Sequence, residues 1–234
     1  MKHILLTLCM LPLFFTSCDT LSSLPGGTFG GYTEAEAAQG IRQALDQGID
    51  KGISFLNKPD GFFGNEAYKL FFPPDAQKVV TTLRDLGFNS VVDKAILQIN
   101  RAAEDAVGHA KPIFANAIRE MTIQDAINIV RGGNDAATQY FREKTTAQLV
   151  AAFMPTIKNS LDNTGATRYY ADVINTYNRF PTTFNKVNPD LPSYVVDKAV
   201  NASFDQVAKE EANIRANPLA RTTEILRKVF GSRF

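Results

Sequence analysis

Apolar residues recur at every third or fourth position through most of the chain, which is typical of α-helices with one buried face. The clearest example is a predicted helix over residues 33–56, whose apolar face carries Ile41, Leu45, Ile49 and Ile53. Charged residues occupy the other faces of this segment. The pattern therefore predicts an amphipathic helix that packs against a protein core.

Capping residues indicate where further helices begin. A Ser or Thr followed three residues later by an acidic residue or Gln can form a capping box, which satisfies backbone N–H groups at a helix start. The pairs with this spacing are Thr33–Glu36, Ser90–Asp93, Thr122–Asp125 and Thr145–Gln148. Asp135 is predicted to cap its own helix, and Ser193 is predicted to cap a long one.

Glycine and proline residues mark where these helices end. The resulting helices are expected near 33–56, 75–86, 90–107, 112–120, 122–131, 135–144, 145–164, 167–179, 193–216 and 218–230. No segment shows sustained strand alternation with hairpin signals. The sequence therefore predicts an all-α fold, a single multi-helix globular domain of about nine to eleven helices.

Small residues form a second stripe on the first helix. Gly40, Ala44, Gly48 and Gly52 follow one another at four-residue spacing. Such a stripe allows close approach of another helix, either within the same chain or across a dimer. We expect close packing within the chain, because charged residues on the same helix indicate a solvent-exposed face.

The first 32 residues have a different character. Met1-Lys2-His3 precedes an apolar stretch over residues 4–15, and Thr16-Ser17-Cys18 follows it. This order is typical of a bacterial lipoprotein signal peptide over residues 1–17, with a lipid attached to Cys18. The apolar stretch is shorter than the roughly 20 residues of a membrane-spanning helix. Residues 18–32, rich in Gly and Ser, are a predicted flexible tether, and residues 33–234 form the domain.

Thr16 and Ser17 resemble the lipobox that precedes a lipidated cysteine, although Phe15 stands where leucine is usual. The alternative is an ordinary secreted protein with an incidental cysteine. Asp19 resembles an inner-membrane retention signal of enterobacteria, but the relaxed lipobox favours another group of bacteria. We therefore expect an anchor in the outer membrane, facing the periplasm, in preference to the inner membrane.

Net charge narrows the choice of partners. The chain has 25 Lys and Arg against 24 Asp and Glu, and removal of residues 1–17 takes away only Lys2. A neutral domain without a long basic run lacks the usual footprint of nucleic-acid binding. The expected partners are the membrane, through the lipid on Cys18, and an envelope protein; we expect a monomer and no nucleic acid.

Cysteine and histidine content narrows the chemistry. Cys9 and His3 lie in the leader, so the domain has no disulfide, no catalytic cysteine and His109 as its only histidine. A multi-histidine zinc site within one chain is excluded, and neither metal nor cofactor is expected. His109 is either a catalytic base or, as we expect, a residue in the turn before a new helix.

The most polar local group of residues is the candidate ligand-binding site. Asp135, Thr138 and Arg142 share one helix face, and Arg168 and Tyr169 open a later helix. Arg offers a planar donor fork to carboxylate or phosphate, so these residues could bind an anion or a peptide. The alternative is a helix cap with surface ion pairs.

Three classes of function remain open. The first choice is a non-enzymatic binding or scaffold module of the cell envelope. The second is a helical bundle that binds a small ligand or lipid, and the third is a carboxylate-based envelope hydrolase. An aromatic cluster could bind a partner or belong to the core; its members are Phe62, Phe63, Phe71 and Phe72. The sequence leans against an enzyme.

Several stretches carry a resemblance to a known family. They are NKPDGF at 57–62, NRAAE at 100–104, AKPIF at 110–114, DAATQYF at 135–141, TRYY at 167–170 and NPLARTTEILRKVFG at 217–231. With them the chain, from about residue 38 to 231, resembles a bacterial family known as domain of unknown function 4197. The resemblance implies an exported, helical and often lipid-anchored protein, and it assigns no role to any residue.

Overall fold

The computed structural model describes residues 28–29, 32–179 and 186–217, together with residues 224 and 227. The predicted leader, Cys18, most of the tether and nearly all of the expected helix at 218–230 lie outside the described residues. The described part is all-α, as predicted. Apart from helices it contains two antiparallel two-residue strands, β1 (Thr28–Phe29) and β2 (Tyr32–Thr33).

The described residues contain eight α-helices and one 3-10 helix, and these α-helices are fewer than the nine to eleven helices expected. They are α1 (Glu34–Leu56), η1 (Pro74–Ala76), α2 (Gln77–Asp85), α3 (Asn89–Val107), α4 (Ala110–Glu120), α5 (Ile123–Arg131), α6 (Ala136–Asn163), α7 (Ala166–Arg179) and α8 (Leu191–Ala216). Within this part of the chain, no helix has both the length and the apolar character needed to cross a membrane.

The main correction concerns α6, a 28-residue helix where the sequence predicted two. Thr145 does not cap a new helix. Its hydroxyl donates to the carbonyl oxygen of Phe141 at 2.6 Å, a bond that Thr makes inside a continuous helix. The buried face runs without a break from Phe141 through Thr145 and Leu149 to Phe153. Burial of this one stripe therefore outweighs the local capping pattern at Thr145, which had indicated the start of a new helix.

Two capping boxes are confirmed. The backbone N–H of Thr33 donates to Glu36 at 2.9 Å, and that of Thr122 donates to Asp125 at 2.9 Å. Two other predicted caps were wrong. Helix α3 begins at Asn89, one residue before Ser90, and helix α8 is capped by Asp190, whose carboxylate accepts from the backbone N–H of Ser193 at 3.0 Å.

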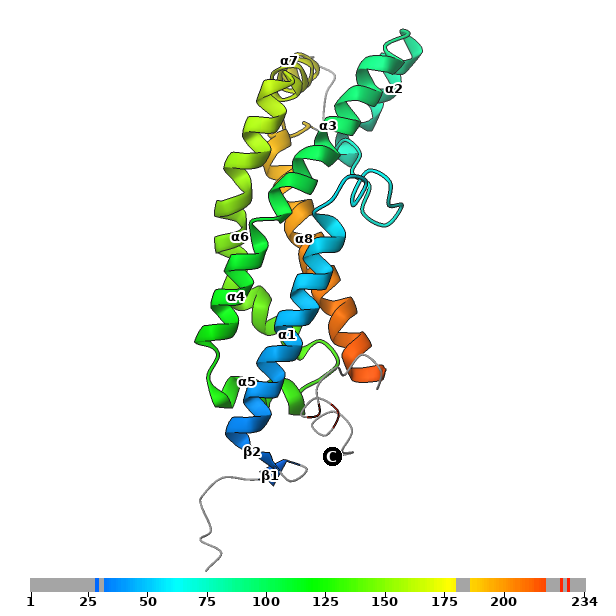
Figure 1. The fold of residues 1–234 in the computed structure, drawn as a ribbon. Helices are drawn as coiled ribbons and strands as arrows, with labels where there is room; N and C mark the ends of the chain where they lie inside the picture. The colour runs from blue at the N-terminus through cyan, green and yellow to red at the C-terminus, as the bar shows by residue number, and fades with distance from the viewer. Residues whose placement is uncertain (1–27, 30–31, 180–185, 218–223, 225–226, 228–234) are drawn as a thin grey trace, which may run out of the picture.

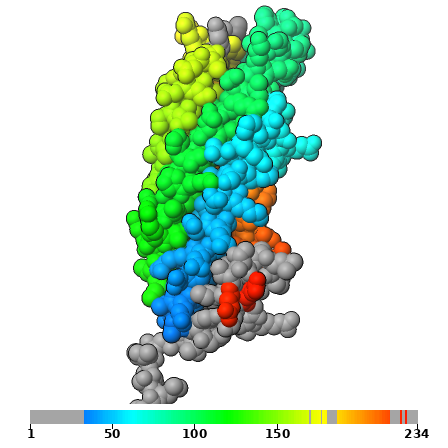
Figure 2. All heavy atoms as spheres, viewed as in Figure 1, coloured from blue at the N-terminus to red at the C-terminus, as the bar shows by residue number. Residues whose placement is uncertain are grey.

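The long helices form an elongated bundle. Figure 1 shows α6 and α8 running along most of its length, with α1, α3 and α4 beside them. Helices α2 and α7 lie at one end, and α5 lies with β1 and β2 at the other. The space-filling view shows the same elongated body, with α2 at one tip (Figure 2).

Close packing of α1 against α8 confirms the predicted role of the small-residue stripe. A Cβ atom at Gly52 would come within 3.1 Å of the Cβ of Gln206, and one at Gly48 within 3.3 Å of the Cβ of Glu210. Both partners lie on α8. The centre of the bundle is aromatic: the ring of Phe114 packs edge-on against Phe141 and Phe204, and all three side chains are fully buried.

Candidate functional site

The structure describes the side chains of four of the five residues of the predicted ligand site, and these four do not gather at one place. Asp135 stands at the N-cap of α6, but its side chain makes no capping hydrogen bond, which corrects the predicted cap. Thr138 is buried, and its hydroxyl donates to the carboxylate of Glu211 at 2.9 Å. Glu211 also accepts the backbone N–H groups of Ala137 and Thr138, at 3.0 and 2.9 Å. A residue of α8 therefore caps α6.

Arg142 lies on the surface of α6, facing α8. Its guanidinium carbon is 4.6 Å from the centre of the Phe204 ring, and Nη1 donates to Asn201 Oδ1 at 3.3 Å. Arg168 is on α7, where it is 85% exposed and 3.8 Å from Asp172. From Arg142 to the end of α6 at Asn163 the helix rises about 30 Å. The structure thus does not bring the two arginines together, and the side chain of Tyr169 lies outside the described residues.

The structure also shows where His109 and the four phenylalanines of the predicted aromatic cluster lie. His109 precedes α4, as predicted for a turn residue, and its Nε2 is 3.2 Å from the hydroxyl of Thr156. Phe62 belongs to the core, whereas Phe71 is 51% exposed. Phe63 lies beneath the Lys69 ammonium at 4.3 Å, and the half-buried Phe72 stacks on Tyr170. These four rings therefore do not form one patch.

The structure contains a large concavity that the sequence did not reveal, which we call the apolar groove. It lies between α2, α3 and α7 and has a volume of about 690 Å³. Its walls carry Val79, Val80 and Leu83 from α2, Val91, Val92 and Ala95 from α3, and Tyr170, Val173 and Ile174 from α7, together with Phe72 and Phe88. The lining is aliphatic and aromatic, with Lys94, Gln98 and Thr164 as its polar members.

The groove exists because α2 packs only on one side. None of the α2 residues is buried, although Val79, Val80 and Leu83 face the groove. Gly87, with φ of 89°, turns the chain sharply into α3. Phe88 and Val91, just after this turn, are 49% and 61% exposed. The helical hairpin of α2 and α3 thus leaves apolar side chains in contact with solvent along the groove.

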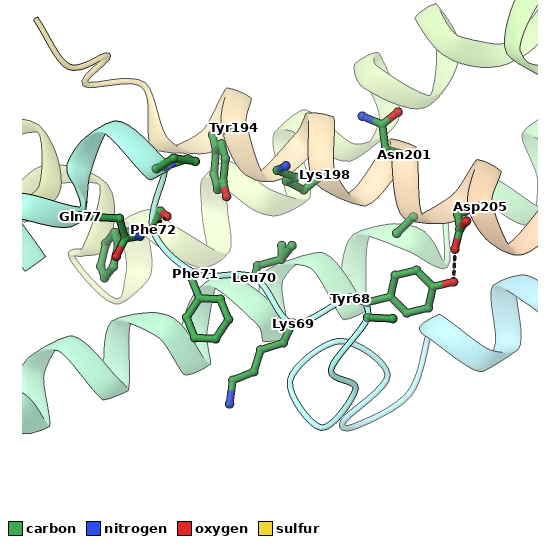
Figure 3. Close-up of a pocket in the computed structure, with 13 residues that line it drawn as sticks. Tyr68, Lys69, Leu70, Phe71, Phe72, Gln77, Tyr194, Lys198, Asn201 and Asp205 are labelled. Carbon is green, nitrogen blue, oxygen red and sulfur yellow. Dashed lines mark hydrogen bonds between the residues drawn. The ribbon is translucent and has the colours of Figure 1, made fainter. Parts of the chain in front are cut away.

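A second concavity, the polar groove, has a volume of about 700 Å³ and lies between the extended segment 69–72 and α8. Figure 3 shows its walls: Tyr68, Leu70 and Phe72 approach from the segment, while the α8 wall carries Tyr194, Lys198, Asn201 and Asp205. These four recur at helical spacing on one face of α8. That polar stripe was visible in the sequence, but nothing there indicated what it faces.

Two buried side chains of α3 hold the first wall in place. Asn100 is fully buried; its amide donates to the carbonyl oxygen of Leu70 and accepts from the backbone N–H of Leu70, both at 2.8 Å. Glu104 accepts the backbone N–H groups of Phe62 and Phe63 at 3.0 and 3.1 Å. The irregular segment before α2 is thereby fixed to the bundle, because the side chains of Asn100 and Glu104 satisfy its backbone groups.

One end of the polar groove is closed by a hydrogen-bonded cluster around Tyr68. Its hydroxyl donates to Asp205 and accepts from Gln206 at 2.7 Å and Lys209 at 2.6 Å. Burial, with the bond to Asp205, raises the pKa of Tyr68. Burial by itself raises the pKa of Asp205. The hydrogen bonds that Tyr68 and Lys209 donate to its carboxylate have a larger combined effect, and the pKa of Asp205 is therefore lowered below its usual range. Asp205 is therefore an ionised group that already has its partners.

The remaining polar groups of the polar groove are mostly donors. Lys198 makes no ion pair among the described residues; its ammonium lies 5.5 Å from the centre of the Tyr194 ring. Burial, with the charge of Asp75, raises the pKa of Tyr194, so that this hydroxyl keeps its proton. Asn201 uses its oxygen to accept from Arg142, which leaves its amide N–H groups to donate.

The described residues contain no group of three or more His, Cys, Asp and Glu side chains that could hold a metal ion. Together, the fold and these two concavities define an all-α bundle with two surface grooves that share Phe72. Over residues 31–231 the chain matches the family described as Protein of unknown function (DUF4197), and it belongs to that family. No curated protein and no solved structure matches it.

Proposed function

We propose that this protein is a non-enzymatic, lipid-anchored module of the bacterial envelope that binds an apolar chain in the groove between α2, α3 and α7. The apolar groove carries the binding proposal. Its volume of about 690 Å³ lies within the range of small-molecule sites, about 300–1,000 Å³. A ligand that covers this lining removes apolar surface from water, which stabilises the complex by about 25 cal/mol per Å².

The carboxylates argue against a hydrolase. A general acid at neutral pH needs a raised pKa. Every Asp or Glu among the described residues whose pKa departs clearly from its usual value is shifted downward; they are Glu36, Asp125, Asp162 and Asp205. These four are suited to hydrogen bonding and ion pairing. This supports a binding role in preference to hydrolysis.

The anchor is proposed from the sequence at Thr16-Ser17-Cys18, with the outer membrane, facing the periplasm, as its location. Cells fed an alkyne-bearing fatty acid should label the wild-type protein and should not label Cys18→Ala. The variant should also move from the membrane to the soluble fraction, because one acyl chain contributes about 0.8 kcal/mol for each buried CH₂ group. Equal labelling of a stable Cys18→Ala protein contradicts the anchor.

Filling the apolar groove tests the binding proposal. Ala95, on the α3 wall, is partly exposed, so Ala95→Phe adds a ring to open space. The neutral fluorescent probe N-phenyl-1-naphthylamine should bind the wild-type chain, and Ala95→Phe should weaken that binding at least tenfold. Ala147→Phe, at an exposed position of α6, is the matched control and should bind like wild type. Unchanged binding to a folded Ala95→Phe protein would refute the proposal.

A further inference from the structure

We propose that the two grooves form one site for an anionic amphiphile, with its aliphatic chain in the apolar groove and its carboxylate or phosphate head in the polar groove. This inference rests on the proposed function and names the ligand class. It is carried by two observations: the grooves adjoin, and their linings are chemically complementary to the two ends of such a molecule.

Phe72 joins the grooves. The residue lines both of them, and its ring stacks on Tyr170 of the apolar wall with ring centres 5.8 Å apart. The chain then turns through Pro74 of the polar groove to Ala76 of the apolar groove. A ligand that crosses Phe72 thus passes from aliphatic walls to polar ones without leaving the protein surface.

The polar groove selects a negative head group. Lys198 and the Tyr194 hydroxyl present donors to it (Figure 3), and Asn201 also belongs to its lining. None of these donors has a hydrogen-bond acceptor or ion-pair partner among the described residues. Arg142, bonded to Asn201, adds a further positive charge at the edge. Hydrogen bonds from charged donors to an anion are about twice as strong as neutral ones.

The nearby carboxylates do not cancel this preference. Asp205 accepts from Tyr68 and lies 2.9 Å from the Lys209 ammonium. Asp75, whose charge acts on Tyr194, accepts the backbone N–H of Asn188 at 3.4 Å. Asp75 keeps its negative charge. Against it stand Lys69 and Lys198 in the lining and Arg142 at the edge, so positive charge predominates around the polar groove.

The test compares two ligands of equal chain length on the full-length protein. Palmitate and hexadecanol each displace N-phenyl-1-naphthylamine, and the wild-type chain should prefer palmitate by about tenfold, which corresponds to about 1.4 kcal/mol. Lys198→Gln should reduce that preference to less than threefold, because it weakens the binding of palmitate more than that of hexadecanol. Lys51→Gln, which removes a lysine paired with Glu210 away from both grooves, should retain it.

The outcomes separate the two proposals. Failure of both ligands to displace the probe overturns the proposed function, and this inference with it. Displacement with equal affinity by both ligands leaves the proposed function standing and overturns the inference. Inorganic phosphate alone should bind at least a hundredfold more weakly than palmitate. If phosphate binds as tightly as palmitate and this binding depends on Lys198, the polar groove is a site for a free anion, and the inference of an amphiphilic ligand is overturned.

Discussion

Replacing Glu211 by Ala should lower the free energy of unfolding by about 3–5 kcal/mol, the range for removal of one partner of a buried ion pair. Glu211 is 4% exposed and accepts two backbone N–H groups of α6 and the hydroxyl of Thr138. It also accepts from Arg215, at 2.8 Å, whose side chain is 15% exposed. The substitution leaves the start of α6 uncapped and removes the carboxylate that faces a largely buried guanidinium. Urea unfolding followed by circular dichroism measures the loss.

The adjacent Glu210 provides the control. It pairs with Lys51, whose side chain is 64% exposed, at 2.7 Å. The Glu210 side chain is 15% exposed, but the ammonium of Lys51 is in water, so Glu210→Ala leaves no buried charge without a partner and should have a much smaller effect on the same helix. Glu211→Gln, which keeps one acceptor oxygen, should lie between the two variants. Equal destabilisation by Glu210→Ala and Glu211→Ala contradicts the assigned role of Glu211 as the cap of α6.

Replacing Asn100 by Ala should lower the free energy of unfolding by about 2–6 kcal/mol, because two buried backbone groups lose their partners. The amide of Asn100 bonds both backbone groups of Leu70 and also donates to the carbonyl oxygen of Ile96 at 2.7 Å. Leu70 is 6% exposed, so its N–H and C=O would lose their partners in a buried position. Each such group costs about 1–3 kcal/mol. Thermal unfolding by calorimetry checks the size of the effect.

The same substitution should affect ligand binding, because Leu70 and Phe72 belong to the wall of the polar groove. A folded Asn100→Ala protein should lose most of its preference for palmitate over hexadecanol. Asn128→Ala removes the same side chain at an exposed position of α5 and should change stability by less than about 0.5 kcal/mol. Retention of both stability and ligand preference in Asn100→Ala would show that this amide does not position the groove wall.

Local signals predicted much of the fold. The Thr33 and Thr122 capping boxes formed as expected, because each involves residues three apart in the sequence. The apolar stripe of α1 is buried, and Gly48 and Gly52 of its small-residue stripe meet α8. These features depend on helical periodicity alone. Sequence patterns of that kind are sufficient to identify both the helix and its buried face.

Features that depend on distant residues were not predicted. Thr145 has the local pattern of a helix start, yet the surrounding core keeps α6 continuous. Asp135 has the residue type of a cap, whereas Glu211 of α8 supplies the capping oxygens. The segment 69–72 has no regular hydrogen-bond ladder, and the side chain of Asn100 in α3 bonds both backbone groups of its Leu70. The contacts of Glu211 and Asn100 join residues that are far apart in the sequence. The continuity of α6 at Thr145 follows from burial of its face within the bundle.

The site was predicted even less completely. Arg142 lies at the edge of the polar groove through its bond to Asn201, but Arg168 lies at the end of the bundle with α7. These residues were predicted from their residue types alone, and the sequence did not show which helices would lie close enough to bring them together. The apolar groove arises because α2 leaves its aliphatic face partly uncovered. Such an opening depends on how helices dock, which no single helix pattern encodes.

A crystal structure of the full-length chain with palmitate that carries bromine at its methyl end would locate both ends of a bound amphiphile. An anomalous bromine peak is expected between α2, α3 and α7, next to Val79 and Val173, with the carboxylate across Phe72 on the Lys198 side. Bromine at another surface, or no bound palmitate at saturating concentration, would show that the two grooves are not the binding site.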